Sequence, residues 1–272
     1  MIRATALVNV MDRAARKAGR ALVRDFGEVE LLQVSKKGPA DFVSSADLRA
    51  EEILRQELSH ARPDFVFVGE EGGGDEGGAG AGTGKTRWLV DPLDGTTNFL
   101  HGVPHFAISI AVVEENRVTA GLVYAPVHDE VYWAANGAGA FVGRRRLRVS
   151  ARTQLRESLI ATGIPYLGRG DHKHFLSTQE TVMGRVAGIR RFGSAALDLA
   201  YVAAGRFDGY WEYGLKPWDI AAGIILVREA GGFVTDPRGG EEMLASGNIV
   251  AGNGAIHTEL RALLAPLGLP AG

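Results

Sequence analysis

The chain has 272 residues, 46% of them hydrophobic and 23% charged, which is typical of a globular protein with a sizeable core. The net charge is only −2, so bulk electrostatics do not predict a nucleic-acid partner, and the short basic run at 144–146 is more typical of a solvated surface. The absence of cysteine excludes disulfides, thiolate metal sites and cysteine nucleophiles. No apolar stretch resembles a signal peptide or a membrane span, so we expect a soluble, cytoplasmic protein without membrane contact.

Helical and extended patterns alternate along the first half. Apolar residues at helical spacing predict a helix over 5–26, and Ser44 or Ser45 can cap a second helix. A loop is expected at 36–39. The inner face of the second helix is expected to carry Leu48, Ile53, Leu54 and Leu58. Strands are expected over 31–34, 65–68, 87–90, 106–113, 118–124 and 131–134.

The second half alternates again. Helices are expected over 173–186, 195–204, 218–230 and 255–264. Strands are expected over 159–162, 206–212, 233–234 and 249–250. Helices and sheets thus come in layers, with a meander of strands in mid-chain, which predicts an α+β protein or layered α/β sandwich.

Residues 72–84 are dominated by Gly and Ala, so we expect a mobile surface loop there. The loop runs into 79–86, which satisfies a relaxed Walker A pattern. A phosphate-binding loop of that kind must open a helix, whereas a strand over 87–90 follows at once. Nucleotide binding is therefore not predicted.

The segment 88–99 holds the most informative chemistry. Asp91 and Asp94 leave a buried strand at a turn punctuated by Pro and Gly, where burying two charges is costly unless a cation compensates them. Hard oxygen ligands favour Mg²⁺, Mn²⁺ or Ca²⁺ over zinc, and the turn at 95–97 can point backbone N–H groups at an anion. The alternative is that both acids merely cap a turn. Glu70, at the end of the preceding strand, and Asp219, at the start of an apolar helix, favour phosphoryl transfer instead.

Two segments carry a resemblance to a known family. Residues 88–101 and 218–232 resemble the two signature regions of the inositol monophosphatase family, and the resemblance covers nearly the whole chain. It implies the αβαβα sugar-phosphatase fold, a homodimer, and Mg²⁺-dependent, Li⁺-sensitive hydrolysis of inositol 1-phosphate or a similar small sugar or polyol phosphate. We expect one compact unit, with most metal ligands in 1–149 and the rest of the site in 150–272. Glu70, Asp91, Asp94, Asp219 and Glu212 fall in the expected order, as do Asp41, Asp47 and 193–196.

The resemblance also assigns roles to single residues. The first of two or three Mg²⁺ ions would be held by Glu70, Asp91 and the carbonyl of Leu93. The second would be held by Asp91, Asp94 and Asp219. A third would sit near Glu70, largely through water.

Further roles concern water and substrate. Thr96, polarised by Asp47, would orient the attacking water, and the amides of Gly95 and Thr96 would hold the phosphate. The resemblance implies that the catalytic residues are Glu70, Asp91, Thr96 and Asp47. The substrate contacts implied are Asp94, Gly95, Thr96, Gly193, Ser194, Ala195, Glu212 and Asp219.

Alternatives remain at the level of substrate and partner. Branches acting on histidinol phosphate, fructose 1,6-bisphosphate or phosphoadenosine phosphate share the metal site, and some bacterial relatives also bind the transcription machinery. A haloacid-dehalogenase type of phosphatase is disfavoured because Asp91 and Asp94 have two residues between them, where that class needs one. A transition-metal site at His172 and His174 is not favoured, because this spacing shares a face only in a strand. The segment 163–173 is a candidate wall of the substrate pocket.

Overall fold

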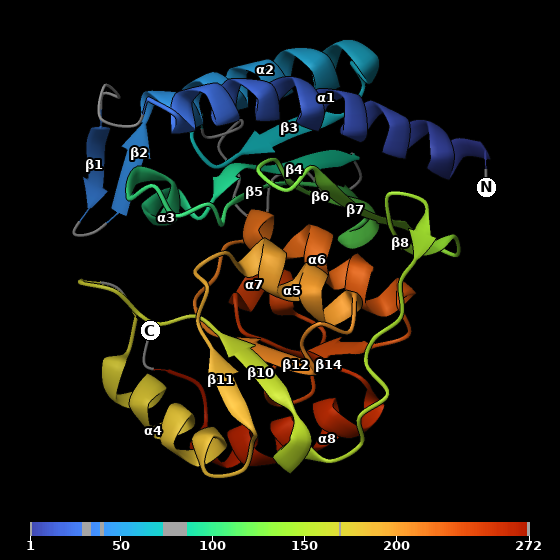
Figure 1. Ribbon diagram of the computed structural model, residues 1–272. Coiled ribbons are helices and arrows are strands. Elements are labelled where there is room, and N and C mark those ends of the chain that lie inside the picture. Colours follow the sequence, from blue (N-terminus) through green and yellow to red (C-terminus); the bar gives the residue numbers. More distant parts are fainter. Residues whose placement is uncertain (1, 29–33, 39–40, 73–85, 169, 271–272) are drawn as a thin grey trace.

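The structure is a computed structural model that describes residues 2–28, 34–38, 41–72, 86–168 and 170–270. Helices and sheets alternate in five layers, so that each of the two large sheets lies between helices (Figure 1). This is the αβαβα sandwich that the sequence resemblance implies. The helical layers are, in order, α1 (Ile2–Phe26) with α2 (Ser45–Ala61), then α5 (Ala195–Ala203) with α6 (Pro217–Glu229), then α4 (His172–Met183) with α8 (Gly254–Leu264).

The larger sheet has seven strands in the order β3-β4-β5-β6-β7-β8-β9. The strand β3 runs parallel to β4, and every later pair is antiparallel, as the predicted meander requires. Seven of the eight residues of β4 are buried, because helices cover both faces of the sheet. The strands are β3 (Val66–Gly69), β4 (Arg87–Asp94), β5 (Ala107–Glu114), β6 (Arg117–Ala125), β7 (Glu130–Ala135), β8 (Gly139–Val142) and β9 (Arg145–Arg146).

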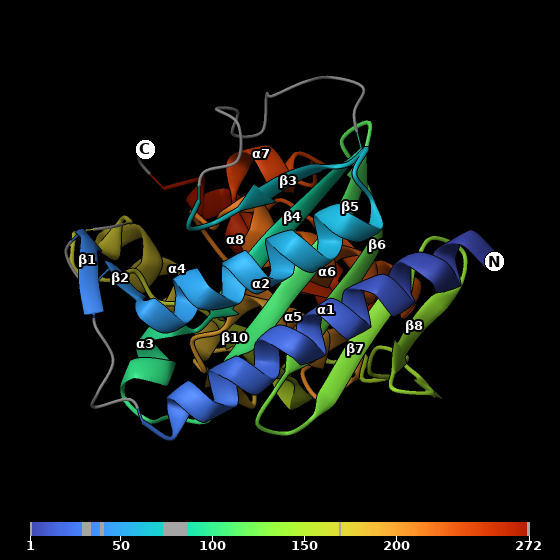
Figure 2. The same ribbon diagram turned by 90° about the horizontal axis from the view of Figure 1, so that it is seen from above.

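Helices α1 and α2 lie side by side over the larger sheet (Figure 2). The apolar stripe predicted for residues 5–26 forms the buried face of α1, with Met11 and Leu22 fully enclosed. Ser44 caps α2, since its hydroxyl accepts the N–H of Ala46 at 3.2 Å while the Asp47 carboxylate accepts the N–H of Ser44 at 2.9 Å. This capping box fixes where the helix begins.

The inner face of α2 differs from the prediction at one residue. Leu54 and Leu58 are fully buried and Ile53 is partly buried, but Leu48 is 53% exposed. Small side chains, including that of Ala50, occupy the core positions of the first turns instead. Leu48 is two residues from Ala50, about 200° around the helix, and therefore faces away from the sheet.

The smaller sheet has five strands in the order β11-β10-β12-β14-β13. The strand β10 is parallel to both of its neighbours, whereas β14 is antiparallel to both of its own. Apolar residues of α5 and α6 fill the space between the two sheets, and the short helix α7 (Met243–Ser246) packs beside α6. The strands are β10 (Leu159–Thr162), β11 (Gly188–Arg190), β12 (Gly209–Glu212), β13 (Phe233–Thr235) and β14 (Ile249–Gly252).

Two predicted boundaries move for local reasons. The strand β12 begins at Gly209 rather than at 206, because the N–H groups of Arg206 and Phe207 both bond the carbonyl of Tyr201 and close a turn. Helix α4 ends at Met183 rather than at 186, and Gly184 follows as its C-cap.

Other segments were not predicted or lie outside the described residues. The loop expected at 36–39 is wrong for 36–38, which belong to β1 (Val34–Gly38), paired with β2 (Asp41–Ser44). Helix α3 (Thr96–Leu100) was missed, as were 3₁₀ turns at Leu155–Glu157 and Ala265–Leu267. The strand expected over 31–33, the glycine-rich loop from 73 on and most of the Walker-like stretch lie outside the described residues. Within the described residues, no helix has the length and apolarity needed to cross a bilayer.

Candidate active site

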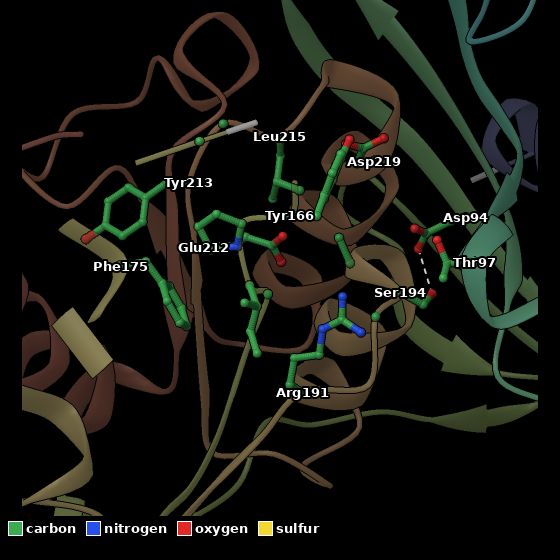
Figure 3. A pocket seen from close by; sticks show the side chains of 18 of the residues that line it. Asp94, Thr97, Tyr166, Phe175, Arg191, Ser194, Glu212, Tyr213, Leu215 and Asp219 are labelled. Atoms are coloured by element: carbon green, nitrogen blue, oxygen red, sulfur yellow. Dashed lines mark hydrogen bonds between the residues drawn. The ribbon is translucent and has the colours of Figure 1, made fainter. Parts of the chain in front are cut away.

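A cavity of about 610 Å³ opens where β4 of the larger sheet and β12 of the smaller sheet end, and the first turns of α5 and α6 reach it from the middle layer (Figure 3). Asp47 stands behind this lining and contacts it through Thr96. The other expected site residues all line the cavity: Glu70, Asp91, Leu93, Asp94, Gly95, Thr96, Gly193, Ser194, Ala195, Glu212 and Asp219.

Strand pairing brings the first two acids together. Gly69 of β3 pairs with Val90 of β4, and the N–H of Glu70 donates to the carbonyl of Val90 at 3.2 Å. Because parallel strands end at the same edge, Glu70 follows beside Asp91. The pairing of β4 with β5 shifts register between Asp91 and Asp94, where the intervening proline cannot donate to the ladder.

Asp219 reaches the same place from the start of α6. Ser109 pairs with Asp91 across the sheet, and its hydroxyl donates to the carbonyl of Trp218 at 2.9 Å. This bond ties the larger sheet to the first turn of α6. One oxygen of Asp219 accepts the N–H of Lys216 at 2.8 Å, which also fixes the carboxylate at the helix N-terminus.

Burial and mutual repulsion raise the pKa values of the acids in the cavity. Burial, followed by repulsion from Glu70, Asp94 and Asp219, raises the pKa of Asp91 well above its usual range. Burial raises the pKa of Asp94 to about 6, although the hydrogen bond from Ser194 opposes the shift. Burial and then Asp94 raise the pKa of Asp219 well above its usual range. A cation among these groups would relieve both the desolvation and the repulsion.

This donor set fits Mg²⁺ in its chemistry. Carboxylate and carbonyl oxygens are hard ligands, and in the lining described above they come from Glu70, Asp91, Leu93, Asp94 and Asp219. Across the described part of the chain, no three acid or histidine side chains already converge tightly enough to hold an ion. A divalent cation would attract these carboxylates towards one another.

Asp94 is anchored to the middle layer. One oxygen accepts the Ser194 hydroxyl at 2.6 Å and the N–H of Ala196 at 2.8 Å. Ser194 is itself the N-cap of α5, with its hydroxyl accepting the N–H of Leu197 at 3.4 Å. The start of α5 therefore sets the orientation of the Asp94 carboxylate.

The side chains of Thr96 and Asp47 are hydrogen-bonded to each other beside the cluster of acids. The Thr96 hydroxyl lies 3.1 Å from Asp47 Oδ1 and 3.0 Å from the Leu93 carbonyl, and both atoms accept. Ser44 donates both its N–H and its hydroxyl to the other Asp47 oxygen. Burial raises the pKa of Asp47, against the effect of these bonds. With its proton committed to an acceptor, the Thr96 oxygen can accept a hydrogen bond from water.

The turn before Thr96 requires glycine. Gly95 has φ +97°, and a Cβ there would lie 3.1 Å from the carbonyl oxygen of His105 and 3.3 Å from that of Gly193. The turn opens α3, whose first N–H groups have no partner within the helix. An anion at this point of the cavity can therefore meet backbone donors.

The opposite wall is formed by the smaller sheet. Glu212 projects from the end of β12, and Figure 3 shows its carboxylate and that of Asp94 on opposite sides of the cavity. Residues 163–166 and 170–171 also line it, in agreement with the expectation that 163–173 forms a wall. His174 lies in the first turn of α4, within this wall, with its ring edge-on to Tyr213.

Sequence reasoning missed one charged residue that lines the cavity and one that is buried behind it. Arg191 lines the cavity, and Figure 3 shows its guanidinium turned into the space between Glu212 and Ser194. Asp198 of α5 is buried beside it, and burial, then Glu212 and Asp94, raise its pKa well above the usual range, with Arg191 opposing. Among the described residues, neither oxygen of Asp198 has a hydrogen-bond partner. An acid inside an otherwise apolar helical stretch was the available signal.

The αβαβα sandwich, with an acid-lined cavity at the end of β4, is the architecture of the sugar-phosphatase fold. The model of the inositol monophosphatase family matches residues 4–267. The chain therefore belongs to the inositol monophosphatase family and is a phosphatase.

Similar proteins carry two kinds of name. The inositol-1-monophosphatase of Mesorhizobium japonicum is 56% identical over 266 residues, covering 98% of this chain and 97% of that protein. The Nus factor SuhB of Pseudomonas aeruginosa is 46% identical over 250 residues, covering 91% of each chain. Among solved structures, the extragenic suppressor protein suhB from Bartonella henselae is 55% identical with a TM-score of 0.90, covering 95% of this chain and 98% of that one.

Proposed function

We propose that the chain hydrolyses inositol 1-phosphate, or a similar small polyol or sugar phosphate, by Mg²⁺-assisted attack of water. The observation that carries this is the meeting of Asp91, Asp94 and Asp219 in one cavity, where burial raises the pKa of each carboxyl. Acids held in that state favour a bound divalent cation. The 56% identity to a protein named inositol-1-monophosphatase supports the choice of substrate.

The metal ligands are proposed as the resemblance assigns them. Glu70, Asp91 and the Leu93 carbonyl would hold one Mg²⁺, and Asp91, Asp94 and Asp219 a second, with a third near Glu70 largely through water. When bound, Mg²⁺ would lower the pKa of water and neutralise charge on the phosphate and the leaving oxygen.

The remaining steps belong to the chain's own groups. Asp47 accepts a hydrogen bond from the Thr96 hydroxyl, so the Thr96 oxygen is left to accept a hydrogen bond from the attacking water and to orient it. The N–H groups of Gly95 and Thr96 donate to the phosphate and hold it in line with that water. Both groups lie on one short turn, so water and phosphate are positioned by the same backbone segment.

The leaving group faces the other wall. Glu212 is proposed to accept hydrogen bonds from hydroxyl groups of the polyol, together with Asp94 and the backbone around Ala195. Gly193 and Ser194 shape the same wall, and Ser194 holds the Asp94 carboxylate in place. Recognition of several hydroxyls favours a polyol or sugar over a simple alkyl phosphate.

A substrate panel tests this function. Phosphate release is measured from inositol 1-phosphate, fructose 1,6-bisphosphate, histidinol phosphate and phosphoadenosine phosphate, with Mg²⁺ and after chelation. Mg²⁺-dependent turnover that is fastest on inositol 1-phosphate is expected. Faster turnover of another ester would keep the reaction and change the substrate, and release that chelation does not reduce would overturn the metal assignment.

Three further properties are proposed from the family resemblance. The chain would act as a homodimer, would reside in the cytoplasm, and would be inhibited by Li⁺ competing at the second metal position. Sedimentation at micromolar concentration tests the dimer, and a Li⁺ titration at fixed Mg²⁺ tests the inhibition. A monomer, or full activity in Li⁺, would contradict these statements separately.

A second candidate function is binding to the transcription machinery alongside catalysis. It is supported by the 46% identity to a protein named Nus factor SuhB. Titration of the chain against purified RNA polymerase, with bovine albumin as the control partner, tests it. Binding that survives Asp91→Asn would show a role separate from hydrolysis, and absence of saturable binding would remove this candidate.

A further inference from the structure

Glu212 is held on its strand by a neighbouring tyrosine. Tyr210 precedes it by two residues on β12, so both side chains emerge on the same face of the sheet. Tyr210 is fully buried, and its hydroxyl donates to Glu212 Oε2 at 2.5 Å. A hydrogen bond to a carboxylate is stronger than one between neutral groups, so one oxygen of Glu212 is fixed from below.

Gly163 leaves the space that the Glu212 carboxylate occupies. A Cβ at Gly163 would lie 1.9 Å from Glu212 Oε1, 2.0 Å from Cδ and 2.2 Å from Oε2. Such distances are far below van der Waals contact, so any side chain at 163 must push the carboxylate away. Glycine is needed here for space, since its φ is not among the positive values of this chain.

The strand register keeps this arrangement in place. Gly163 directly follows β10, which runs parallel to β12, with Thr162 paired to Trp211. The Thr162 hydroxyl lies 2.8 Å from the Trp211 carbonyl, which can accept its proton. Gly163 and Glu212 therefore leave their strands side by side, and the carboxylate rests over the glycine backbone.

We propose that Tyr210 and Gly163 are positioning residues that fix the Glu212 carboxylate for recognition of a polyol hydroxyl. The inference rests on the proposed function, because it concerns how that site selects its leaving group. Neither residue takes part in the hydrolysis, so both act through Glu212 alone. They set affinity for hydroxyl-bearing esters and leave the reaction of an ester without hydroxyls unchanged.

Two variants and two matched controls test the proposal. Tyr210→Phe removes only the hydroxyl, and Gly163→Ala adds the displacing methyl group. Tyr132→Phe is the first control, because Tyr132 is a fully buried tyrosine that donates to Glu130, two residues away on β7 and outside the cavity. Gly184→Ala is the second, because a Cβ there meets nothing nearer than 3.9 Å.

Kinetics with two esters provide the first readout. Tyr210→Phe is expected to raise KM for inositol 1-phosphate about tenfold and to change kcat less than about twofold, with no change on phenyl phosphate. In a Glu212→Ala background the same substitution should add nothing, since it acts through that carboxylate. An equal loss in that background, or an equal loss on phenyl phosphate, would overturn the proposal.

Crystal structures of the variants provide a readout independent of substrate. The Glu212 carboxylate should be displaced in Gly163→Ala and should lose its single orientation in Tyr210→Phe, while both controls match the parent. An unmoved, well-ordered Glu212 in both variants would overturn the inference whatever ester the enzyme prefers. If the parent turns over another hydroxyl-bearing ester instead, the proposed substrate fails, and the same double-mutant comparison on that ester decides the inference.

Discussion

Glu51 offers a direct test of how the turn that carries Glu70 is held. It lies on α2 and is only 3% exposed. Its carboxylate accepts the N–H groups of Glu71 and Gly72, each at 2.7 Å, and the guanidinium of Arg55 at 2.8 Å. One buried side chain thus organises the backbone directly after the proposed metal ligand.

The expected cost of Glu51→Gln follows from these contacts. The amide keeps one acceptor oxygen but turns an NH₂ group towards a donor, so at least one charge-assisted bond is lost, at about 1.5–3 kcal/mol. For a chain of this size, each kcal/mol lowers Tm by about 2–4 °C, which gives a fall of roughly 3–12 °C. Because the turn also loosens, the Mg²⁺ concentration for half-maximal rate should rise several-fold.

The measurement is thermal unfolding with and without Mg²⁺, together with a Mg²⁺ titration of the rate. Glu52→Gln is the matched control, since this neighbour is exposed and, within the part of the chain that the structure describes, accepts a hydrogen bond only from Gln56. It should change stability by less than about 0.5 kcal/mol. If Glu51→Gln and Glu52→Gln give the same Tm and the same Mg²⁺ dependence, Glu51 does not hold the turn.

Asp91→Asn should abolish turnover with little loss of Tm, because it removes a repelled, buried charge, and a near-normal kcat would contradict the metal assignment. Glu212→Ala should mainly raise KM for inositol phosphates, and an unchanged KM would remove the case for hydroxyl recognition there. Burial lowers the pKa of His257 to about 4, below its unfolded value of about 6.5, so the folded state keeps it neutral. Its contribution to stability is therefore complete above pH 6.5 or so and is lost as pH falls towards 4. Unfolding titrations should show a shallower acid loss in His257→Gln, and an unchanged slope would count against this assignment.

The reactive side of the site was predictable because its signals are local. Asp91 and Asp94 flank a proline within a buried strand, and a glycine follows them at a turn, so the pattern carries both the burial and the bend. The apolar stripe of α1 was equally legible, because every inward position recurs at helical spacing. Ser44 indicated the start of α2, because a serine hydroxyl can accept hydrogen bonds from the free N–H groups of a first helical turn.

The parts of the site and of the fold that were not predicted depend on contacts between segments that are far apart in the sequence. Arg191 lines the cavity from the segment between β11 and α5, and it has no pattern of its own in the sequence. Asp198 is buried on α5, between the two sheets, and its one signal is that it is an acid in an apolar helical stretch. Leu48 misled the prediction because leucine is usually buried, whereas alanines sufficed where α2 packs closely. The short strands β8, β9 and β11 have four residues or fewer and are defined by their partners.

The two walls of the cavity come from different sheets, and this division separates two kinds of selection. In the proposed mechanism, the wall around β4 and α3 would determine whether a phosphate ester is cleaved, while the wall around β10 and β12 would determine which alcohol is released. Substitutions at the ends of β10 and β12 can therefore exchange one alcohol for another without touching the groups proposed to cleave the bond. A single scaffold of this design can give rise to enzymes with one reaction and many substrates, each altered at the edge of the smaller sheet.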